Sequence, residues 1–273
     1  MDIDPRYCPT RLRKFLQELK QTPKKSLSQN FLIDGNVIKK ILAAASVKKG
    51  DLVLEIGPGP GALTQGLIEI GAEVIAVEKD RAFARALQND FKTLTVYEDD
   101  ILQFSLDAVP RKCKVISNLP YNLTTPILKK LLPRVDLFSQ LILMVQKEVA
   151  LRICESPGHK NFGPLALLAQ FYSNPRYLFT VKQNCFYPAP KVDSAIIALD
   201  SRTPPHVSDE KAFFEMVRNC FNQRRKMLRR TLPALFPKSN TEEIFKAIQI
   251  KSTARPEELS LEQFIALFEE LTK

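Results

Sequence analysis

The sequence lacks the features of a membrane, zinc-binding or disulfide-stabilised protein. No apolar run reaches the ~18 residues that a membrane helix needs, and the N-terminal segment has no apolar stretch of signal-peptide type. The 273 residues include only 2 histidines, and the 5 cysteines are scattered without a CxxC pair. We therefore expect reduced cysteines, no metal ion, no membrane contact and a cytoplasmic location.

Acidic residues are outnumbered by lysines and arginines, and the resulting formal net charge of +10 indicates a polyanionic partner such as a nucleic acid. The excess is strongest in the first 40 residues, where nine Lys and Arg stand against four Asp and Glu. Composition alone leaves open the alternative of an ordinary solvated surface. A second run of basic residues lies nearer the C-terminus and consists of Arg224, Arg225, Lys226, Arg229 and Arg230.

The middle of the chain alternates between short apolar runs and segments with helical spacing. Strands that alternate with helices are typical of βαβ units, so the pattern predicts an α/β fold with a mostly parallel sheet of seven strands. The last two strands are connected by residues 182–193 only, a short loop that suits antiparallel neighbours. The seven expected strands are residues 52–56, 73–77, 94–98, 113–117, 141–145, 176–181 and 194–199.

The pattern changes at residues 201–208, a polar and proline-rich stretch that we interpret as a linker. Residues 37–200 before it would form the sheet domain. Residues 209–273 after it are helical in pattern throughout, with a Ser–Gln capping-box signature at the start of the last helix. Residues 1–36 form a basic arm that precedes the first clear helix. The helices expected after the linker are residues 211–223, 225–236, 242–249 and 261–273.

A glycine-rich segment, Glu-Ile-Gly-Pro-Gly-Pro-Gly, connects the first expected strand to a helix. Its glycines, Gly57, Gly59 and Gly61, would let a ligand approach the backbone closely at the carboxyl edge of the sheet. The dinucleotide fingerprint has its third glycine five positions after the first, where this chain has Ala62. This spacing argues against a nicotinamide or flavin cofactor. A plain tight turn is the alternative interpretation of the segment.

Acidic side chains follow the next two strands. Glu78 comes about 20 residues after the first glycine, where an acid can accept hydrogen bonds from both hydroxyls of a ribose. Because both NAD and S-adenosylmethionine contain that ribose, Glu78 does not separate these cofactors. Asp99 and Asp100 are equally placed by spacing to accept from the N6 amine of a cofactor adenine. Solvent-exposed acids at strand ends are the alternative.

The motif that indicates the chemistry is Asn118-Leu119-Pro120-Tyr121, directly after the strand at 113–117. The N6 amine of adenine is a poor nucleophile, because its lone pair is delocalised into the ring. Acceptors aimed at its two N–H groups, the Asn118 side-chain carbonyl and the Leu119 backbone carbonyl, would favour attack on a methyl sulfonium. Pro120 stiffens the loop, and Tyr121 offers a flat face on which an extruded base can stack. An ordinary turn is the alternative.

With these motifs together, the sequence resembles the ribosomal RNA adenine N6,N6-dimethyltransferases, in particular the bacterial small-subunit enzymes of the KsgA type. The resemblance covers about residues 22–235, and its motifs are together highly specific. It implies a Rossmann-like, seven-stranded S-adenosylmethionine-dependent methyltransferase domain with a small all-α C-terminal domain that binds rRNA. The matching segments are SLSQNFLID (26–34), GDLVLEIGPGPGALT (50–64), SNLPYNLTTPIL (117–128), MVQKEVALRI (144–153), FYPAPKVDSA (186–195) and FNQRRKMLRR (221–230).

The resemblance also implies how the cofactor, S-adenosyl-L-methionine, would be bound. Asn30 and Leu32 would contact it from the N-terminal arm, which thus contributes to the cofactor site. Gly57 and its neighbours would pass beneath the methionine moiety, and Glu78 would hold the ribose. Asp100, rather than the acid before it, would hold the cofactor adenine.

For the target base, the resemblance implies that Asn118 lies at the methyl-transfer point, in contact with the cofactor. It implies that Phe186 helps Tyr121 to sandwich the target adenine, although the sequence alone would make Phe186 a core aromatic. Two positions depart from the family pattern, since Ser28 and Asp99 stand where glycine is usual. These departures concern the shape of the part of the chain that would cover the bound cofactor.

Members of this family methylate two adjacent adenines in a hairpin loop near the 3′ end of small-subunit rRNA. The resemblance implies the same partner, in the late assembling subunit rather than in naked RNA, and we expect a monomer. The basic run would contact this rRNA. On the helix expected there, Arg225 and Arg229 share a face, and Lys226 with Arg230 forms a second row. A solvated helix face is the alternative.

Three other functions compete with this interpretation. The large-subunit rRNA adenine methylases share the glycine loop and the Asn-x-Pro-Tyr motif, but the LPYN context and the QRRKMLRR segment favour the small-subunit type. A ribosome-assembly or transcription factor could keep the fold without catalysis, which the intact motif argues against. The glycine spacing argues against a nicotinamide oxidoreductase.

Overall fold

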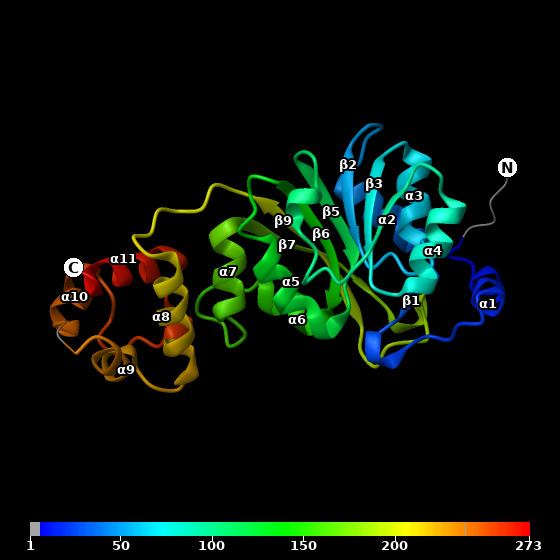
Figure 1. Ribbon diagram of the computed structural model, residues 1–273. Helices are drawn as coiled ribbons and strands as arrows, with labels where there is room; N and C mark the ends of the chain where they lie inside the picture. Colours follow the sequence, from blue (N-terminus) through cyan, green and yellow to red (C-terminus); the bar gives the residue numbers. More distant parts are fainter. Residues whose placement is uncertain (1–5, 238) are drawn as a thin grey trace. The chain divides into compact units, whose positions relative to one another are not determined.

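The computed structural model of the protein describes residues 6–237 and 239–273. The chain divides into two compact units, and the colours of Figure 1 allow the segments of each to be followed along the sequence. The first unit runs through Ala150 and resumes with Asn174–Ser201; the second comprises Leu151–Ser173 and Arg202–Lys273.

A seven-stranded sheet forms the centre of the first unit (Figure 1), in the order β4-β3-β2-β5-β6-β9-β7. The seven predicted strands are present and the sheet is mostly parallel, as predicted, with β9 antiparallel to β6. The order reverses between β2 and β5, and open α/β sheets bind ligands at such a switch point, beyond the carboxyl ends of the strands. The strands are β2 (Leu52–Ile56), β3 (Glu73–Glu78), β4 (Thr95–Glu98), β5 (Cys113–Asn118), β6 (Phe138–Gln146), β7 (Ser173–Val181) and β9 (Ser194–Ser201).

Three helices of the first unit, α2, α3 and α4, begin where a short polar side chain or a glycine precedes them. Asp34 caps α2 and Asp80 caps α4, each accepting from first-turn backbone amides at distances from 2.9 to 3.3 Å. Helices α2 and α3 pack closely, because a Cβ on Gly66 would lie 2.7 Å from the Leu42 side chain. The remaining elements are η1 (Lys25–Leu27), β1 (Phe31–Leu32), α2 (Gly35–Ala45), α3 (Ala62–Ile70), α4 (Arg81–Asp90), η2 (Leu106–Ala108), η3 (Tyr121–Leu123), α5 (Thr124–Leu131), η4 (Gln183–Cys185) and β8 (Phe186–Tyr187).

The N-terminal arm contains a helix, α1 (Pro9–Glu18), which the sequence analysis did not predict. Its apolar residues, among them Leu12 and Phe15, are buried and pack with Phe31 and Phe83. The prediction missed α1 because most of the segment is polar, and only a narrow apolar stripe at helical spacing identifies it. Short helices are stabilised by packing against other elements more than by propensity, and here the partners come from β1 and α4.

The second unit is helical, with a core dominated by aromatic side chains. Phe213 lies between Phe171 and Phe268, with ring centroids 5.7 Å from each. The predicted capping box is confirmed, since the Gln263 amide donates to Ser260 Oγ at 3.3 Å and the Ser260 amide donates to Gln263 Oε1 at 3.0 Å. The helices are α7 (Pro164–Tyr172), α8 (Glu210–Asn222), α9 (Leu228–Leu235), α10 (Thr241–Ala247), η5 (Pro256–Glu258) and α11 (Leu261–Leu271), and the boundary at Ala150 falls inside α6 (Lys147–Ile153).

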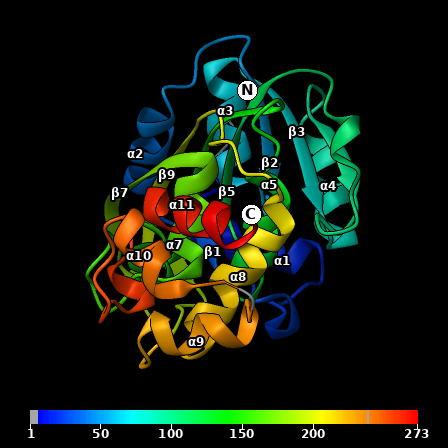
Figure 2. The same ribbon diagram turned by 90° about the vertical axis from the view of Figure 1, so that its left-hand side faces the viewer.

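The basic run does not lie on one helix, because residues 223–227 form a turn between α8 and α9 (Figure 2). The Leu228 amide donates to the Ala254 carbonyl at 2.9 Å, a tertiary hydrogen bond that takes the place of an intrahelical one. The sequence predicts that the second helix begins at residue 225, whereas α9 begins at Leu228, where the amide is bonded to a distant carbonyl instead of to a preceding helical turn. Arg225 therefore lies in the turn and Arg229 in the first turn of α9, without the common helical face that was expected.

Candidate active site

The loop between β2 and α3 turns through the left-handed region of backbone conformation. Gly57 has a φ of 62° and Gly61 a φ of 92°, which glycine adopts without the steric cost of a Cβ. A Cβ on Gly61 would lie 2.6 Å from the Leu87 side chain, whereas at Gly57 no non-neighbouring atom of the described residues lies within 4 Å of that position. Gly57 therefore leaves its backbone accessible, while Gly61 allows close packing.

A cavity lies at the switch point of the sheet, within the first unit. It collects side chains from the carboxyl ends of β2, β3, β4 and β5 and from the N-terminal arm. Two residues that the sequence predicts for the site are not among those that line the cavity. Gly61 lies between Pro60 and Ala62, which do line it, and packs against Leu87, while the Phe186 side chain is buried in the core, 3% exposed. The predicted site residues that line the cavity are Asn30, Leu32, Gly57, Gly59, Glu78, Asp100, Asn118, Leu119, Pro120 and Tyr121.

Glu78 ends β3 with a buried carboxyl group whose two oxygens are each held by a backbone amide. Oε2 accepts from the Gly59 amide at 2.9 Å, and Oε1 accepts from the Asp80 amide at 2.7 Å. Burial raises the pKa of Glu78, and these two hydrogen bonds oppose that effect. Since an ionised carboxylate offers about four acceptor positions, Glu78 can accept further hydrogen bonds from ligand hydroxyls in the cavity.

Asp100 lies beyond β4 and is held from two sides. Its Oδ1 accepts from the Leu102 amide at 2.9 Å, and its Oδ2 accepts from the Lys79 ammonium group at 2.8 Å. The hydrogen bond from Lys79 lowers the pKa of Asp100. Asp99 also lines the cavity, and its Oδ1 accepts from the Asp100 amide at 2.7 Å. Both acids therefore reach the cavity, and Asp100 is the one paired with a cation there.

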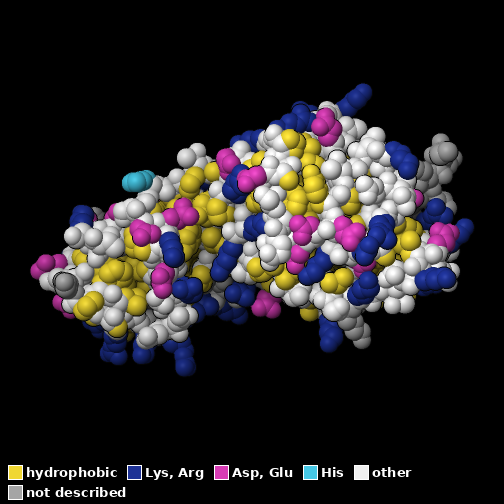
Figure 3. All heavy atoms as spheres, viewed as in Figure 1, with side chains coloured by type: hydrophobic (Ala, Val, Ile, Leu, Met, Phe, Trp, Pro, Cys, Tyr) yellow, Lys and Arg dark blue, Asp and Glu magenta, His cyan; other side chains and the backbone are white. Residues whose placement is uncertain are grey.

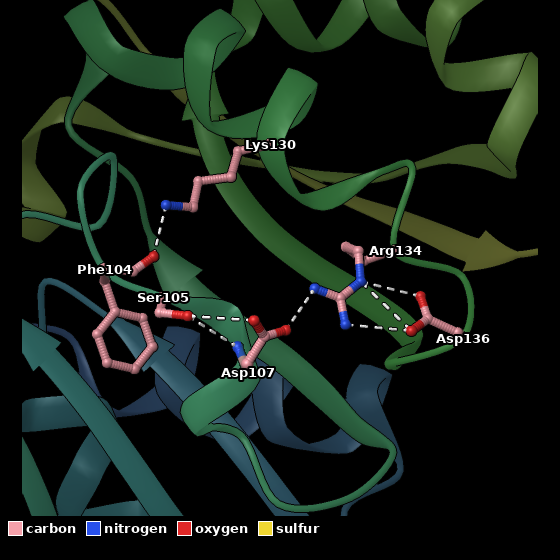
Figure 4. A network of polar contacts seen from close by, with 6 residues as sticks. All are labelled: Phe104, Ser105, Asp107, Lys130, Arg134 and Asp136. Atoms are coloured by element: carbon pink, nitrogen blue, oxygen red, sulfur yellow. Dashed lines mark hydrogen bonds and ion pairs between the residues drawn. The ribbon is translucent and has the colours of Figure 1, made fainter.

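The loop that follows Asp100 is fastened to α5 by a network of polar contacts (Figure 4). The Lys130 ammonium group donates to the backbone carbonyls of Leu102 and Phe104 at 3.1 and 2.6 Å. The other members of this network are Ser105, Asp107, Arg134 and Asp136. Lys130 therefore holds the loop that follows Asp100 against α5, the helix that begins shortly after the Asn118-to-Tyr121 segment.

Asn118 is the last residue of β5, and its amide is oriented by the N-terminal arm. Its Nδ2 donates to the Asn30 backbone carbonyl at 3.0 Å. An amide donates through its nitrogen and accepts through its oxygen, so this contact leaves Oδ1 as an acceptor for an N–H of a ligand. The loop backbone is fixed at the next residue, where the Leu119 amide donates to the Met144 carbonyl at 3.1 Å.

The N-terminal arm is bonded to the loop that follows Asn118 at a second point. The Ser28 hydroxyl donates to Asn122 Oδ1 at 3.1 Å. Ser28 has a φ of 51°, which explains physically why a glycine is usual at this position in the resembling family. Farther along the arm, Leu32 in β1 pairs with Phe186 in β8. The arm thus contributes both backbone and side-chain contacts to the cavity.

Asp80 was not singled out from the sequence, yet it joins the arm to the cavity loops. In addition to capping α4, its Oδ2 accepts from Lys24 Nζ at 2.8 Å and from Gln29 Nε2 at 3.0 Å. Burial raises the pKa of Asp80, but the hydrogen bonds from Lys24 and Gln29 outweigh that effect and lower it. An Asp before a helix is a recognisable cap signal, but that signal does not reveal contacts with a distant arm.

Two further titratable side chains beside the glycine loop were also missed. Glu55 is 1% exposed and accepts from the Thr64 hydroxyl at 2.7 Å; burial raises its pKa to about 8. Arg6 donates to the Pro60 carbonyl at 2.8 Å and lies over two phenylalanine rings, 4.7 and 4.8 Å from their centroids. Glu55 belongs to the recognised glycine segment, whereas nothing in the sequence distinguishes Arg6 from other basic residues of the arm.

Outside the cavity, the basic run lies in the second unit. Arg224 is 3.8 Å from the Glu257 carboxylate, whereas the side chains of Arg225, Lys226 and Arg230 are exposed. Figure 3 shows Lys and Arg side chains projecting from the surface over α9. The run therefore presents cations to solvent from a turn and from the start of a helix.

The part of the chain that the structure describes contains no helix long and apolar enough to cross a bilayer. Among these same residues, no group of three or more His, Cys, Asp or Glu side chains is arranged to hold a metal ion. Cys113 and Cys220 are buried, and burial raises the pKa of each thiol to about 12.

The sequence is similar to one protein family over almost its whole length. The family model described as ribosomal RNA adenine dimethylase matches residues 20–273. A protein of Protochlamydia amoebophila, described as ribosomal RNA small subunit methyltransferase A, is 51% identical over 98% of this chain and 98% of its own length. A protein of Chlamydia felis with the same description is 40% identical over 99% of this chain and 98% of its own.

Solved structures agree with this similarity. A dimethyladenosine transferase from Plasmodium falciparum has a TM-score of 0.75 and 25% identity, and the match covers 89% of this chain and 97% of that one. The 23S rRNA methyltransferase ErmE has a TM-score of 0.71 and 25% identity, with coverages of 89% and 100%. These similarities and the sheet topology confirm the predicted Rossmann-like methyltransferase fold with C-terminal helices. Within that class, the chain belongs to the ribosomal RNA adenine dimethylase family.

Proposed function

We propose that this protein transfers methyl groups from S-adenosyl-L-methionine to the N6 atoms of two adjacent adenines in a hairpin loop near the 3′ end of small-subunit rRNA. The observation that carries the proposal is the Asn118 amide, whose nitrogen is bonded to the arm and whose oxygen remains an acceptor at the cavity. Relatives described as small-subunit methyltransferases, at 51% and 40% identity, support the small subunit rather than the large one.

The cavity residues fit an adenosyl cofactor. The Glu78 carboxylate has acceptor positions for the two ribose hydroxyls, and Asp100, beyond the next strand, can accept from the adenine amine. The accessible backbone at Gly57 suits the methionine moiety, and Asn30 and Leu32 line the same cavity from the arm. When bound there, S-adenosyl-L-methionine would supply an electrophilic methyl group on sulfur.

Asn118 and Leu119 would hold the target amine. Their carbonyl oxygens would accept its two N–H groups, which favours a tetrahedral nitrogen and concentrates the lone pair on it. After one methylation a single N–H remains, so one of the two acceptors suffices to hold the amine for the second transfer. The proton that leaves the cationic product amine passes to water, because such an amine is a strong acid, and the chain needs no strong general base.

Tyr121 would stack on the extruded adenine, because it is an aromatic residue of the cavity lining and follows the two acceptors after Pro120. Phe186, the second ring that the resemblance implies, is buried. In our proposal Phe186 supports the arm through its pairing with Leu32, since a stacking role would require its ring to leave the core.

The helical C-terminal residues 209–273 would hold the rRNA backbone, with the protein acting as a monomer on the late assembling subunit. The exposed cations Arg225, Lys226 and Arg230, with Arg224 and Arg229, support phosphate contacts of a kind that positions RNA without reading its sequence. Relatives named for rRNA are consistent with such a partner.

Transfer of tritiated methyl groups to small subunits that lack the modification, followed by mapping of the labelled bases, tests the proposal. We expect label on two neighbouring adenines and none on large-subunit rRNA. Label on large-subunit rRNA alone would favour the large-subunit methylase. Tight binding to the small subunit without any label would favour an assembly factor, and calorimetric binding of NAD in place of S-adenosylmethionine would favour an oxidoreductase.

A further inference from the structure

The segment FYPAPKVDSA (186–195) contains a buried serine, Ser194, that the proposed function leaves without a role. Ser194 is the first residue of β9 and is 0% exposed. Its Oγ lies 2.5 Å from Tyr121 Oη, and either hydroxyl can donate in this hydrogen bond. The contact joins residues that are 73 positions apart in the sequence and connects β9 with the loop that carries the target-base motif.

The sheet fixes the distance between this serine and the proposed methyl-transfer point. Ser194 pairs with Gln146 on β6, and Asn118 pairs with Met144 two positions earlier on the same strand. Because side chains two positions apart on a strand point to the same face, β6 holds Ser194 and Asn118 in a constant relation.

The backbone on the other side of Ser194 is equally constrained. The preceding residue, Asp193, accepts from the Lys147 amide through its carbonyl at 3.0 Å. Its carboxylate accepts from Lys182 Nζ at 2.9 Å and from the Gln183 amide at 3.3 Å. The Ser194 hydroxyl is therefore attached to a backbone that cannot easily shift.

Tyr121 is the ring on which this constraint acts. Its backbone carbonyl accepts from the Thr124 hydroxyl at 3.2 Å, so the hydrogen bond to Ser194 anchors the far end of a side chain whose near end is already fixed. A phenolic O–H lies close to the plane of its ring, so this anchor favours one ring plane. Among the described residues that line the cavity, the aromatic rings are Tyr121 and Phe31, and Phe31 packs edge-on against Phe83 at 5.4 Å.

We propose that Ser194 is a positioning residue that sets the ring plane of Tyr121 for stacking on the target adenine. Ser194 acts through Tyr121 and does not itself contact the base. The inference rests on the proposed function, because stacking presupposes an extruded adenine in the cavity.

A double-mutant cycle tests the inference with Ser194→Ala, Tyr121→Phe and the combined variant, assayed by methyl transfer to unmodified small subunits. Each single change removes the same hydrogen bond, so each should lower kcat by about three- to tenfold and leave the dissociation constant of S-adenosylmethionine within about twofold. The combined variant should be no slower than either single one. Ser173→Ala is the control, since Ser173 is also buried and its hydroxyl donates to the Ala169 carbonyl at 2.7 Å, in the second unit.

The control should lower the melting temperature without lowering kcat, which separates a loss of packing from a loss of ring orientation. Wild-type kcat in Ser194→Ala, or multiplicative losses in the combined variant, would overturn the inference while leaving the proposed function intact. If Ser194→Ala does not fold, unchanged kcat in Tyr121→Phe overturns it. A wild-type protein that transfers no methyl group to either ribosomal subunit removes the proposed function, and the inference with it.

Discussion

The cavity edge of the sheet and the basic run of the second unit differ in how their side chains are held. At the edge, Glu78 and Asn118 end strands of the same sheet and are oriented by hydrogen bonds to backbone groups. In the basic run, Arg225 and Lys226 extend into solvent from a turn. The first arrangement suits a small ligand that needs fixed geometry, and the second suits a phosphate backbone that needs charge. Substitutions should therefore have sharp effects at the edge and graded effects in the basic run.

The largest effect is expected at Asn118. Asn118→Ala removes a side-chain acceptor at the transfer point, so methyl transfer should fall by at least about 100-fold, the usual loss for a preorganised polar group at a reacting centre. S-adenosylmethionine binding, measured by calorimetry, should stay within about tenfold, because most proposed cofactor contacts lie on other loops. Full activity in this variant would contradict the role of Asn118 as an acceptor for the target amine. It would also mean that the cavity edge tolerates substitution as well as the basic run does.

Burial of Glu55, which lines the cavity, makes the free energy of unfolding depend on pH. Glu55 has a pKa of about 8 in the folded protein against 4.5 for an ordinary glutamate. Between these values the unfolded chain releases a proton that the folded chain retains, so the free energy of unfolding falls as the pH rises and levels off above about 8. Glu55→Gln cannot titrate, and wild type should lose roughly 3–5 kcal/mol relative to it across this interval.

Urea denaturation of both proteins at several pH values between these limits measures that difference. The control is Glu69→Gln on the exposed face of α3, which should leave the pH dependence of wild type unchanged. Parallel curves for wild type and Glu55→Gln would show that Glu55 is ionised in the folded protein.

A third comparison uses two glutamates that lie opposite each other in the sheet. Glu78 pairs with Glu98, but only Glu78 is buried and lines the cavity. Glu78→Ala should weaken S-adenosylmethionine binding by about 1.5–3 kcal/mol, the range for hydrogen bonds to a charged group, and turnover should recover at high cofactor concentration. Glu98→Ala should change neither quantity. An unchanged calorimetric dissociation constant in Glu78→Ala would refute the ribose contact.

Adjacent lysines on α5 allow a smaller effect to be measured. Lys130→Met removes two hydrogen bonds to the loop that follows Asp100, so S-adenosylmethionine binding should weaken by about three- to tenfold. Lys129→Met makes the same change at an exposed neighbour and should have no effect on binding. Equal dissociation constants for the two variants would mean that the loop keeps its position without Lys130.

Dependence on distant partners explains which parts of the structure the sequence predicts and which it does not. Strands and strand-end residues such as Glu78 and Asn118 follow from local patterns, because a buried apolar run fixes the strand and the next residue falls at its carboxyl edge. The helix α1 and the turn at 223–227 depend on distant partners, Phe83 for the first and Ala254 for the second. Local patterns do not contain those partners.

Individual site contacts show the same limit. The sequence places Asp80 before a helix, but its bonds to Lys24 and Gln29 arise only when the arm folds back on the sheet. The family resemblance implies a place for Phe186 beside the target base, whereas in this structure its side chain is buried in the core of the first unit. Family motifs identify chemistry, and tertiary packing decides which side chains are exposed to perform it.

The smallest change in rate is expected from the basic run. Arg225→Gln with Arg229→Gln should weaken binding to the small subunit, and the log–log salt slope should fall by about 0.7–0.9 for every phosphate that is no longer neutralised. The two residues lie in the turn and at the start of α9, outside the cavity, so cofactor affinity and the saturated rate should not change.

Lys39→Gln with Lys40→Gln, two exposed lysines on α2, removes the same charge elsewhere and should leave the slope unchanged if contact rather than net charge matters. A wild-type slope in the arginine variant would mean that both residues are only solvated. A collapsed saturated rate with a wild-type slope would mean that this segment supports the active site, and the contrast between a fixed edge and an adaptable basic run would fail.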